Sequence, residues 1–334
     1  MLKHYLRMAW RAMIRRPVYA GLNIFGLALG MAATILIVHV IWFESSFDRF
    51  HTDYEHTYRL IRHDGSGSGE ARDLSGVFVG MGPELVATQP GVVAAARLTK
   101  TLRAPTVWSD DYQFNESAIF YADSSLFEVF DFKLQRGDPH TVLSEPGKAV
   151  VSEDFARDHF GSLDVIGKKL RLVSLLNESE FEISGILKEV PLASHLQPRM
   201  LLSWISLKQN IQTRQFITRQ WDPFMSSQTY VRTRSDMTQE ALDTAIDSIC
   251  AAHAPKWTRE DPQQYIFSQG IAEIYLGPEY RAESVTYGSQ NLLDYLQALA
   301  LIILLAAWIN YINLATAFAS TRSKEVGVRK AIGA

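Results

Sequence analysis

The hydrophobic side chains of this chain are concentrated in two long stretches near its ends. From about Tyr19 to Phe43, and again from about Tyr295 to Phe318, the sequence contains no Asp, Glu, Lys or Arg. About 20 helical residues cross a hydrocarbon core of ~30 Å, and in lipid a helix satisfies its own backbone hydrogen bonds. A core helix of a soluble protein, the alternative, seldom has an apolar run of this length. The pattern therefore predicts two transmembrane helices, over residues 19–43 and 293–319.

Basic residues flank both apolar stretches on the sides of the chain ends. They are Lys3, Arg7, Arg11, Arg15 and Arg16 before the first stretch, and Arg322, Lys324, Arg329 and Lys330 after the second. Only one acid, Glu325, lies in these flanks. The positive-inside rule therefore places both termini in the cytoplasm and residues 44–292 outside. The outer region holds 24 basic and 34 acidic residues, a net charge of −10.

Residues 1–18 have the pattern of an amphipathic helix on the cytoplasmic side. Basic residues recur at steps of four from Lys3 to Arg15, which places them on one helical face. Such a helix lies flat on an anionic membrane leaflet. A simple cluster of charges that fixes topology is the alternative. Pro17 is expected to end the helix before the first span.

The outer region, residues 44–292, mixes strand and helix patterns. Runs of apolar and alternating residues indicate strands, and capping residues indicate helices. Strands are predicted over Thr57–Arg62, Val92–Leu98, Lys148–Val151, Lys169–Leu175, Glu180–Leu187, Gln228–Arg234 and Ile271–Leu276, and helices over Pro83–Thr88, Ser124–Phe130 and from Ser152 to Gly161.

A longer helix is predicted to run to about Ala252. Asp236 with Gln239 resembles a capping box at its start. The inner face of this helix is expected to hold Met237, Ala241, Ala245 and Ile249. The fold class predicted from these patterns is an α+β membrane protein, in which two transmembrane helices flank a mixed α/β periplasmic domain.

Motifs of nucleotide-binding and hydrolytic enzymes are missing from the sequence. It contains no G-x-x-x-x-G-K-[ST] loop, no G-x-S-x-G elbow and no H-E-x-x-H pair. His51 and His56 are five residues apart, which does not match a helical metal pair, and they are expected on a solvated surface. Cys250 is the only cysteine, so no intramolecular disulfide can form. We predict no catalytic residue, metal site or cofactor, and no nucleic-acid partner.

Three separated stretches resemble one family of membrane proteins. The start reads L-R-M-A-W-R-A-M-I-R-R-P-V-Y-A-G-L-N-I-F-G-L-A-L-G-M-A, followed by F-E-S-S-F-D-R-F-H at Phe43–His51. The middle contains L-F-E-V-F-D-F-K-L-Q-R-G-D-P at Leu126–Pro139, A-V-V-S-E-D-F-A-R-D-H-F-G at Ala149–Gly161 and I-S-G-I-L-K-E-V-P at Ile183–Pro191. The end reads W-I-N-Y-I-N-L-A-T-A-F-A-S-T-R-S-K-E-V-G-V-R-K-A-I-G-A at Trp308–Ala334. Together they resemble MacB-like/FtsX-like ABC transporter permeases.

The resemblance implies a multi-pass permease subunit in the bacterial inner membrane, in contact with membrane lipid. ATP hydrolysis by a separate cytoplasmic ABC ATPase would move its helices and thereby its periplasmic domains, in a dimeric permease assembly. Peptides, macrolides or lipoproteins are the substrates that the family exports or extracts. Its members continue past the I-G-A motif into at least two more spans, so this chain is expected to be the N-terminal part of a permease.

Two sets of residues are candidates for coupling and for helix packing. In the cytoplasmic segment 320–334, the resemblance implies contact with the ATPase by Arg322, Lys324, Glu325, Gly327, Arg329 and Lys330. The alternative is an ordinary basic flank. In the spans, small residues allow helices to approach closely, and polar groups in hydrocarbon need partners. The predicted packing residues are Gly26, Gly30, Asn310 and Asn313.

A membrane-anchored sensor is the alternative function. It would share the order helix, outer domain, helix, and would bind a periplasmic ligand. A sensor needs a signalling linker with heptads after its second span, whereas Thr321–Ala334 has no heptad pattern. This difference favours the permease.

Overall fold

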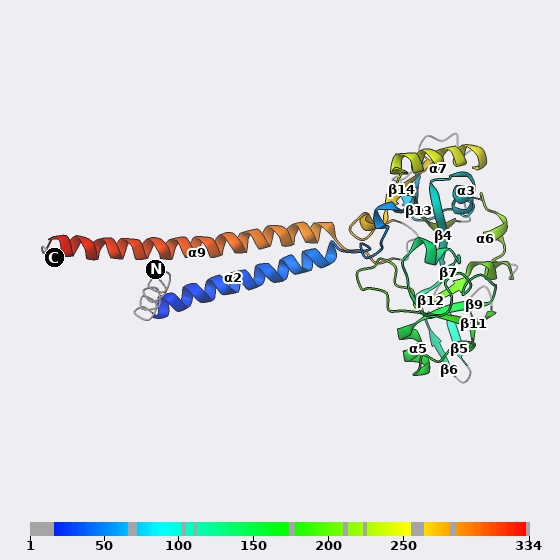
Figure 1. The fold of residues 1–334 in the computed structure, drawn as a ribbon, viewed down its shortest axis with the longest axis horizontal. Helices are drawn as coiled ribbons and strands as arrows, with labels where there is room; N and C mark the ends of the chain where they lie inside the picture. Colours follow the sequence, from blue (N-terminus) through cyan, green and yellow to red (C-terminus); the bar gives the residue numbers. More distant parts are fainter. Residues whose placement is uncertain are drawn as a thin grey trace. The chain divides into compact units, whose positions relative to one another are not determined.

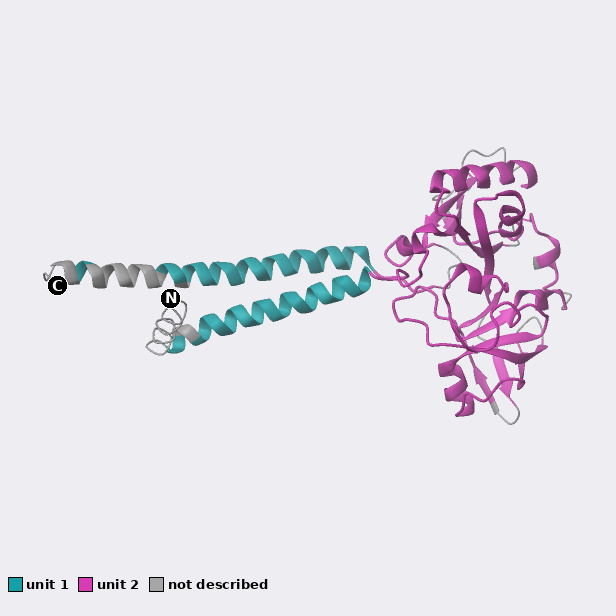
Figure 2. Ribbon diagram, in the orientation of Figure 1, with its two compact units in different colours: residues 1–45, 289–334 teal, residues 46–288 magenta. Residues whose placement is uncertain are grey.

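The computed structural model describes residues 17–65, 72–101, 105–109, 112–173, 178–209, 213–222, 226–254, 264–280 and 285–331. The chain forms two compact units, one made of residues 1–45 with 289–334 and the other of residues 46–288 (Figure 2). Nearly all of the predicted amphipathic helix over residues 1–18 lies outside the described residues.

The first unit is a pair of long helices, α2 (Pro17–Glu44) and α9 (Gln290–Ala331), which lie side by side (Figure 1). Gly21–Glu44 and Gln290–Asn313 are long and apolar enough to cross a membrane. Only 6% and 17% of the residues in their most apolar stretches are buried. Because so many apolar side chains have no protein cover, the pair indicates a membrane protein rather than a soluble helical core. α9 continues as one helix from the predicted span into the predicted cytoplasmic segment.

The second unit is built on one large twisted sheet. Its strands are β1 (Thr57–Asp64), β2 (Arg72–Leu74), β3 (Val77–Phe78), β4 (Val92–Lys100), β5 (Thr106–Ser109), β6 (Tyr112–Asn115), β7 (Ile119–Ala122), β8 (Leu134–Arg136), β9 (Lys148–Ser152), β10 (Lys169–Val173), β11 (Glu178–Leu187), β12 (Met200–Ser203), β13 (Ser226–Thr233) and β14 (Gln264–Gly270). Their order is β14-β1-β13-β4-β7-β12-β9-β11-β10-β5-β6, and β2, β3 and β8 pair beside this path. The pairs β7–β12 and β9–β11 are parallel, and the other pairs are antiparallel.

Short helices cover the sheet and close its apolar clusters. The helical elements of this unit are α3 (Met81–Thr88), α4 (Leu126–Val129), α5 (Glu153–Phe160), α6 (Gln215–Thr218), α7 (Gln239–His253) and the 3-10 turns η1 (Tyr54–His56), η2 (Trp204–Lys208) and η3 (Ile271–Glu273). α3 and α7 pack on the strands near β14, α4 packs on β4 and β13, and α5 packs on β9 and β11 (Figure 1). A mixed α/β domain beside two apolar helices confirms the predicted fold class.

The helix after β9 follows its sequence signals closely. The Ser152 side chain accepts a hydrogen bond from the Phe155 amide at 3.0 Å, which satisfies one free donor of the first turn. Gly161 ends the helix with φ 63°, a left-handed conformation that glycine adopts without strain. The predicted helix from Ser152 to Gly161 is therefore confirmed.

The start of α7 differs from the prediction. Thr238, not Asp236, is the N-cap residue, and its hydroxyl accepts from the Ala241 amide at 3.3 Å. Gln239 does not complete a capping box, because its side-chain amide donates to the Ser268 carbonyl of β14 at 2.8 Å. This contact with the sheet decides where the helix begins.

The inner face of α7 is rotated accordingly. Leu242 and Ile246 are fully buried, and the predicted Ala245 and Ile249 are nearly so. Ala241, which was expected on this face, is exposed, and Met237 is half-buried before the helix begins.

The strand predicted over Ile271–Leu276 is wrong. Ile271 and Ile274 are both fully buried in one apolar cluster, and a spacing of three places them on the same side of a helical turn. The 3-10 turn η3 therefore occupies this stretch, and the edge strand β14 precedes it.

Candidate functional site

The two long helices approach each other closely at the predicted glycines. A Cβ atom on Gly30 would lie 3.0 Å from the Ala307 Cβ, and one on Gly26 would lie 3.2 Å from the Asn310 Nδ2. Only glycine fits at these separations without displacing its neighbour. The structure thus brings three of the four predicted packing residues to the surface between α2 and α9.

The other polar residues of the pair have different surroundings. Asn313 is exposed on α9. Asn23, which sequence reasoning did not select, has a buried side-chain oxygen with no hydrogen-bond partner among the described residues. Its position in an apolar stretch was the signal that could have identified it.

The predicted coupling segment lies in the last turns of α9. Gly327 has open space around it, since no atom lies within 4 Å of a Cβ built there. The side chains of Arg322, Lys324, Glu325, Arg329 and Lys330 are outside the described residues. The role of these six residues stays a prediction.

In the second unit, the segment that follows α2 is joined to the segment that precedes α9. The Phe47 and Tyr275 rings stack with their centroids 3.3 Å apart and their planes 6° apart. Both side chains are buried. Phe47 lies three residues after the end of α2, and Tyr275 lies on the chain that leads from β14 towards α9.

Asp48 is the centre of a buried polar network. Its backbone has φ 59°, a left-handed conformation that aspartate tolerates better than most residues. Its carboxylate accepts hydrogen bonds from the Ser194 hydroxyl at 3.2 Å and the His195 amide at 3.1 Å, and lies 2.8 Å from the His195 Nδ1. Asp48 and His195 are 0% and 1% exposed. A buried carboxylate needs such partners, because burial without them costs several kcal/mol.

The network continues from His195 to Arg59 through Tyr230. The His195 Nε2 lies 3.0 Å from the Tyr230 hydroxyl, and Arg59 also hydrogen-bonds to Tyr230. Arg59 donates to the Gln269 Oε1 at 2.7 Å and lies over the Tyr280 ring, 5.3 Å from its centroid. Burial raises the pKa of Tyr230 to about 12 and lowers the pKa of the Arg59 guanidinium. Tyr230 therefore stays neutral. Through His195 and Tyr230, the network connects the Asp48 carboxylate to the Arg59 guanidinium, a group of opposite charge.

One direction in this network is fixed, because a guanidinium can only donate. The Tyr230 oxygen therefore accepts from Arg59, and the Tyr230 hydroxyl keeps its own proton for the contact with the His195 Nε2. We call Asp48, His195, Tyr230, Arg59 and Gln269 the buried polar network. It joins the segment after α2 to β13, β1 and β14.

His51 is buried beside this network, which corrects the expectation of a solvated surface. It is 2% exposed, and its Nδ1 accepts from the Asp131 amide at 3.0 Å. Its ring lies against Phe50, Phe130 and Phe132. Burial lowers the pKa of His51 to about 4, although the carboxylates of Asp48 and Asp131 oppose that shift.

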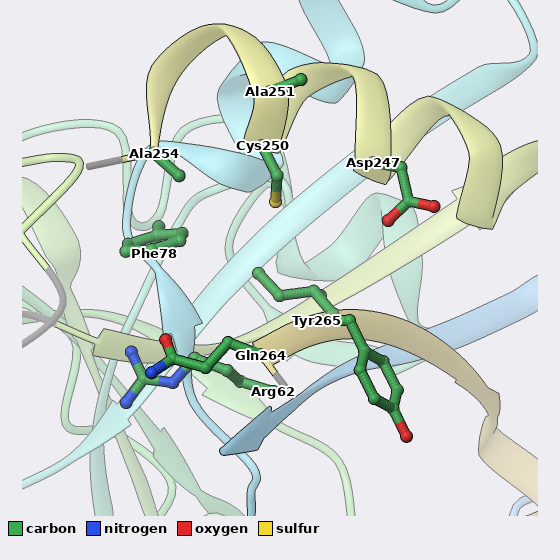
Figure 3. A pocket seen from close by; sticks show the side chains of 9 residues that line it. Arg62, Phe78, Asp247, Cys250, Ala251, Ala254, Gln264 and Tyr265 are labelled. Carbon is green, nitrogen blue, oxygen red and sulfur yellow. The ribbon is translucent and has the colours of Figure 1, made fainter. Parts of the chain in front are cut away.

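A small cavity beside α7 contains the only cysteine (Figure 3). Its volume is about 280 Å³, and Figure 3 shows the Cys250 sulfur pointing from α7 towards the strands, with Phe78 and Arg62 on the opposite side. Burial raises the pKa of the Cys250 thiol to about 12. Because the thiolate is the reactive form, this cysteine is a poor nucleophile at neutral pH. Among the described residues, no group of three His, Cys, Asp or Glu side chains could hold a metal ion.

Sequence reasoning found only part of this site. It selected the stretch F-E-S-S-F-D-R-F-H through the family resemblance but gave Asp48 no role. An acid and a histidine between phenylalanines were the available signal. His195 and Arg59 lie in stretches without a motif, and His195 is 147 residues from Asp48 in the chain, so local patterns could not pair them.

Comparison with known proteins agrees with the architecture. The sequence model of the MacB-like periplasmic core domain matches residues 20–249. A domain of a putative permease protein from Porphyromonas gingivalis has a TM-score of 0.54 and 22% identity, and the match covers 66% of this chain and 92% of that one. This likeness supports the fold.

Two further solved structures have lower scores. The periplasmic region of MacB from Actinobacillus actinomycetemcomitans has a TM-score of 0.46 and 14% identity, over 66% of this chain and 90% of that one. The extracellular domain of the noncanonic ABC-type transporter YknZ from Gram-positive bacteria has a TM-score of 0.45 and 15% identity, over 64% and 99%. No curated protein matches the chain.

Proposed function

The chain belongs to the MacB-like periplasmic core domain family, and from this membership we propose that it is a membrane component of an ABC transporter. In this proposal it is the permease subunit, with residues 46–288 in the periplasm. A separate cytoplasmic ATPase hydrolyses ATP, and the permease acts as a dimer in the bacterial inner membrane. Peptides, macrolides and lipoproteins are the candidate substrates.

In this proposal, movement of the membrane helices changes the shape of the outer domain. The observation that supports it best is the buried polar network together with the Phe47–Tyr275 stack. These contacts tie the segment after α2 and the segment before α9 to β14, β1 and β13, the three strands at one end of the sheet. A displacement of either segment would therefore move strands instead of a loose linker. Such a connection is what a protein needs if helix movement is to change the shape of an outer domain.

Coupling to the ATPase is assigned to the end of α9. We propose that Arg322, Lys324, Glu325, Gly327, Arg329 and Lys330 contact the ATPase, and that the exposed Asn313 faces another helix of the permease assembly. An exposed Glu–Lys or Glu–Arg pair on a helix stabilises it by only ~0.3–0.5 kcal/mol. Reversing the Glu325 charge should therefore leave folding unchanged and affect mainly contact with the partner.

Co-purification of the ATPase with the full-length permease tests this assignment. Glu325→Lys and Gly327→Leu should each weaken ATPase association and substrate-stimulated ATP hydrolysis by tenfold or more, with normal membrane insertion. The double variant Thr321→Lys/Ser323→Lys makes the same change of +2 in net charge and keeps Glu325, and Ala331→Leu adds similar bulk beyond Gly327. Both controls should retain the ATPase. If Glu325→Lys and Gly327→Leu both keep full association with the ATPase, the segment is only a basic membrane flank and the coupling assignment is wrong.

Topology is tested separately with reporter fusions. The basic flanks support a periplasmic location for residues 44–292 and a cytoplasmic location for both termini. A periplasm-dependent reporter should be active after Gly270 and inactive after Arg322. Activity in the opposite pattern would contradict the proposed orientation without bearing on ATPase contact.

A further inference from the structure

An open cavity of about 710 Å³ lies in the second unit, and none of its lining residues belongs to the buried polar network or to the Cys250 cavity. Its walls come from the segment after α2, the stretch from α4 to Pro139, and the segment that follows β11. Phe50, Phe127 and Phe132 form an aromatic part of the lining. Ligand pockets typically have about 300–1,000 Å³ and an apolar lining with a few polar groups. The volume of this cavity lies in that range, and its lining combines the aromatic part with polar and charged side chains.

Two lysines are neighbours in the wall of this cavity. β8 and β11 are antiparallel with Leu187 opposite Leu134, and the Lys188 amide donates to the Lys133 carbonyl at 2.9 Å. Lys188 and Lys133 are therefore direct cross-strand neighbours with side chains on the same face, and both line the cavity. Like charges opposite each other destabilise an antiparallel pair.

Protein carboxylates do not neutralise this lysine pair. Asp131 and Glu189 also line the cavity, yet neither forms an ion pair with Lys133 or Lys188, whose ammonium groups have no ion-pair partner among the described residues. The Asp131 carboxylate accepts from the Thr52 amide at 2.5 Å instead. Two adjacent cations beside an aromatic surface are complementary to a ligand that has an acid group at the end of an apolar chain.

We propose that this cavity binds a long-chain carboxylate, with the carboxylate on Lys133 and Lys188 and the hydrocarbon chain on Phe50, Phe127 and Phe132. This inference names a ligand class for the outer domain and rests on the proposed function only for its biological role. Carboxylate binding needs no ATPase. An experiment can therefore contradict the binding site and leave the proposed ATPase contact intact, or the reverse.

Photo-cross-linking of the full chain in phosphatidylcholine nanodiscs tests the proposal. The probe is dodecanoate with a diazirine on its chain, and labelled peptides are identified by mass spectrometry. Labels are expected in the peptides containing Phe127–Gly137 and Lys188–Pro191. Unmodified dodecanoate should compete for them, whereas acetate and dodecyltrimethylammonium should not, because one lacks the chain and the other has the wrong charge.

Charge reversal supplies the matched comparison. Lys133→Glu/Lys188→Glu should reduce labelling of these peptides at least tenfold, and Lys133→Ala/Lys188→Ala should reduce it with less effect on the fold. Lys208→Glu/Arg214→Glu makes the same change in net charge at exposed positions elsewhere in the second unit and should change labelling less than twofold. Labelling confined to α2 and α9, equal competition by dodecyltrimethylammonium, or unchanged labelling in both lysine variants would overturn the proposal.

Discussion

At the scale of single residues, charges buried in the second unit have the largest expected effects. Asp48 and Arg59 are both 0% exposed and belong to one hydrogen-bonded network. Removing one partner of a buried charged pair costs about 3–5 kcal/mol, because the other charge is left without compensation. The same argument does not apply to the many exposed ion pairs of this domain, which each contribute about 0–1 kcal/mol.

Asp48→Asn should therefore lower the free energy of unfolding by about 3 kcal/mol. Asparagine has nearly the same shape and tolerates the left-handed backbone, so the loss reports the charge and its hydrogen bonds rather than strain. Urea denaturation measures the change. Asp236→Asn is the control, since Asp236 pairs with Arg234 at the surface at 3.2 Å and should change stability by less than about 1 kcal/mol. Equal effects of the two substitutions would refute the assigned role of Asp48.

His51 should make the stability of the second unit depend on pH. Its pKa is about 4 in the folded protein and 6.5 when unfolded, so between these values the unfolded chain binds more protons. Stability is complete above pH 6.5 and falls as the pH decreases towards 4, by about 3 kcal/mol in total.

Unfolding measured from pH 7 to pH 4 checks the His51 prediction. The variant His51→Phe should show a smaller loss over this range than the wild type. His140→Gln, whose side chain is 73% exposed in the wild type, should show the same loss as the wild type. A pH profile that is identical in His51→Phe and the wild type would assign the effect to other groups.

At the scale of elements, the sequence predicted what local chemistry decides and missed what distant contacts decide. α5 was predicted with its caps because Ser152 and Gly161 act within their own helix turns. The two long helices were predicted because their apolar runs have no charged residue. The start of α7 and the turn η3 depend instead on Ser268 of the neighbouring strand and on a shared apolar cluster. The order of strands in the sheet and the pairing of Asp48 with His195 likewise depend on residues far apart in the chain.

The close approach of α2 and α9 can be tested with a disulfide. In a Cys250→Ser background, Gly30→Cys/Ala307→Cys should cross-link under mild oxidation, because their Cβ atoms are close enough for a bridge after a small adjustment. Gly21→Cys/Ala307→Cys is the matched control, since a Cβ on Gly21 has no atom within 4 Å. Cross-linking of less than half of the first variant, or equal cross-linking of the two, would contradict this helix pairing.

At the scale of the whole molecule, the second unit should be stable without the helices. It has several apolar clusters, a continuous sheet and no need for a disulfide. A fragment of residues 45–291 is expected to be a monomeric folded protein with cooperative unfolding. Circular dichroism and urea denaturation measure this property. A fragment that unfolds without cooperativity would show that the helices contribute to its core.

In the same fragment, Cys250→Ser should change the free energy of unfolding by less than about 1 kcal/mol, as expected for a small, isolated thiol.

The unbroken course of α9 has a consequence for rotation as well as for length. Its 42 residues span about 63 Å, and each residue turns the helix by about 100°. Two alanines inserted after Ser320 would rotate the segment beyond by about 200°, whereas four would rotate it by only about 40° while displacing it twice as far. If the ATPase recognises one side of this helix, the four-residue insertion should keep more substrate-stimulated ATP hydrolysis than the two-residue insertion. The rotation of α9 about its axis, more than its length, would then decide which side chains contact the ATPase.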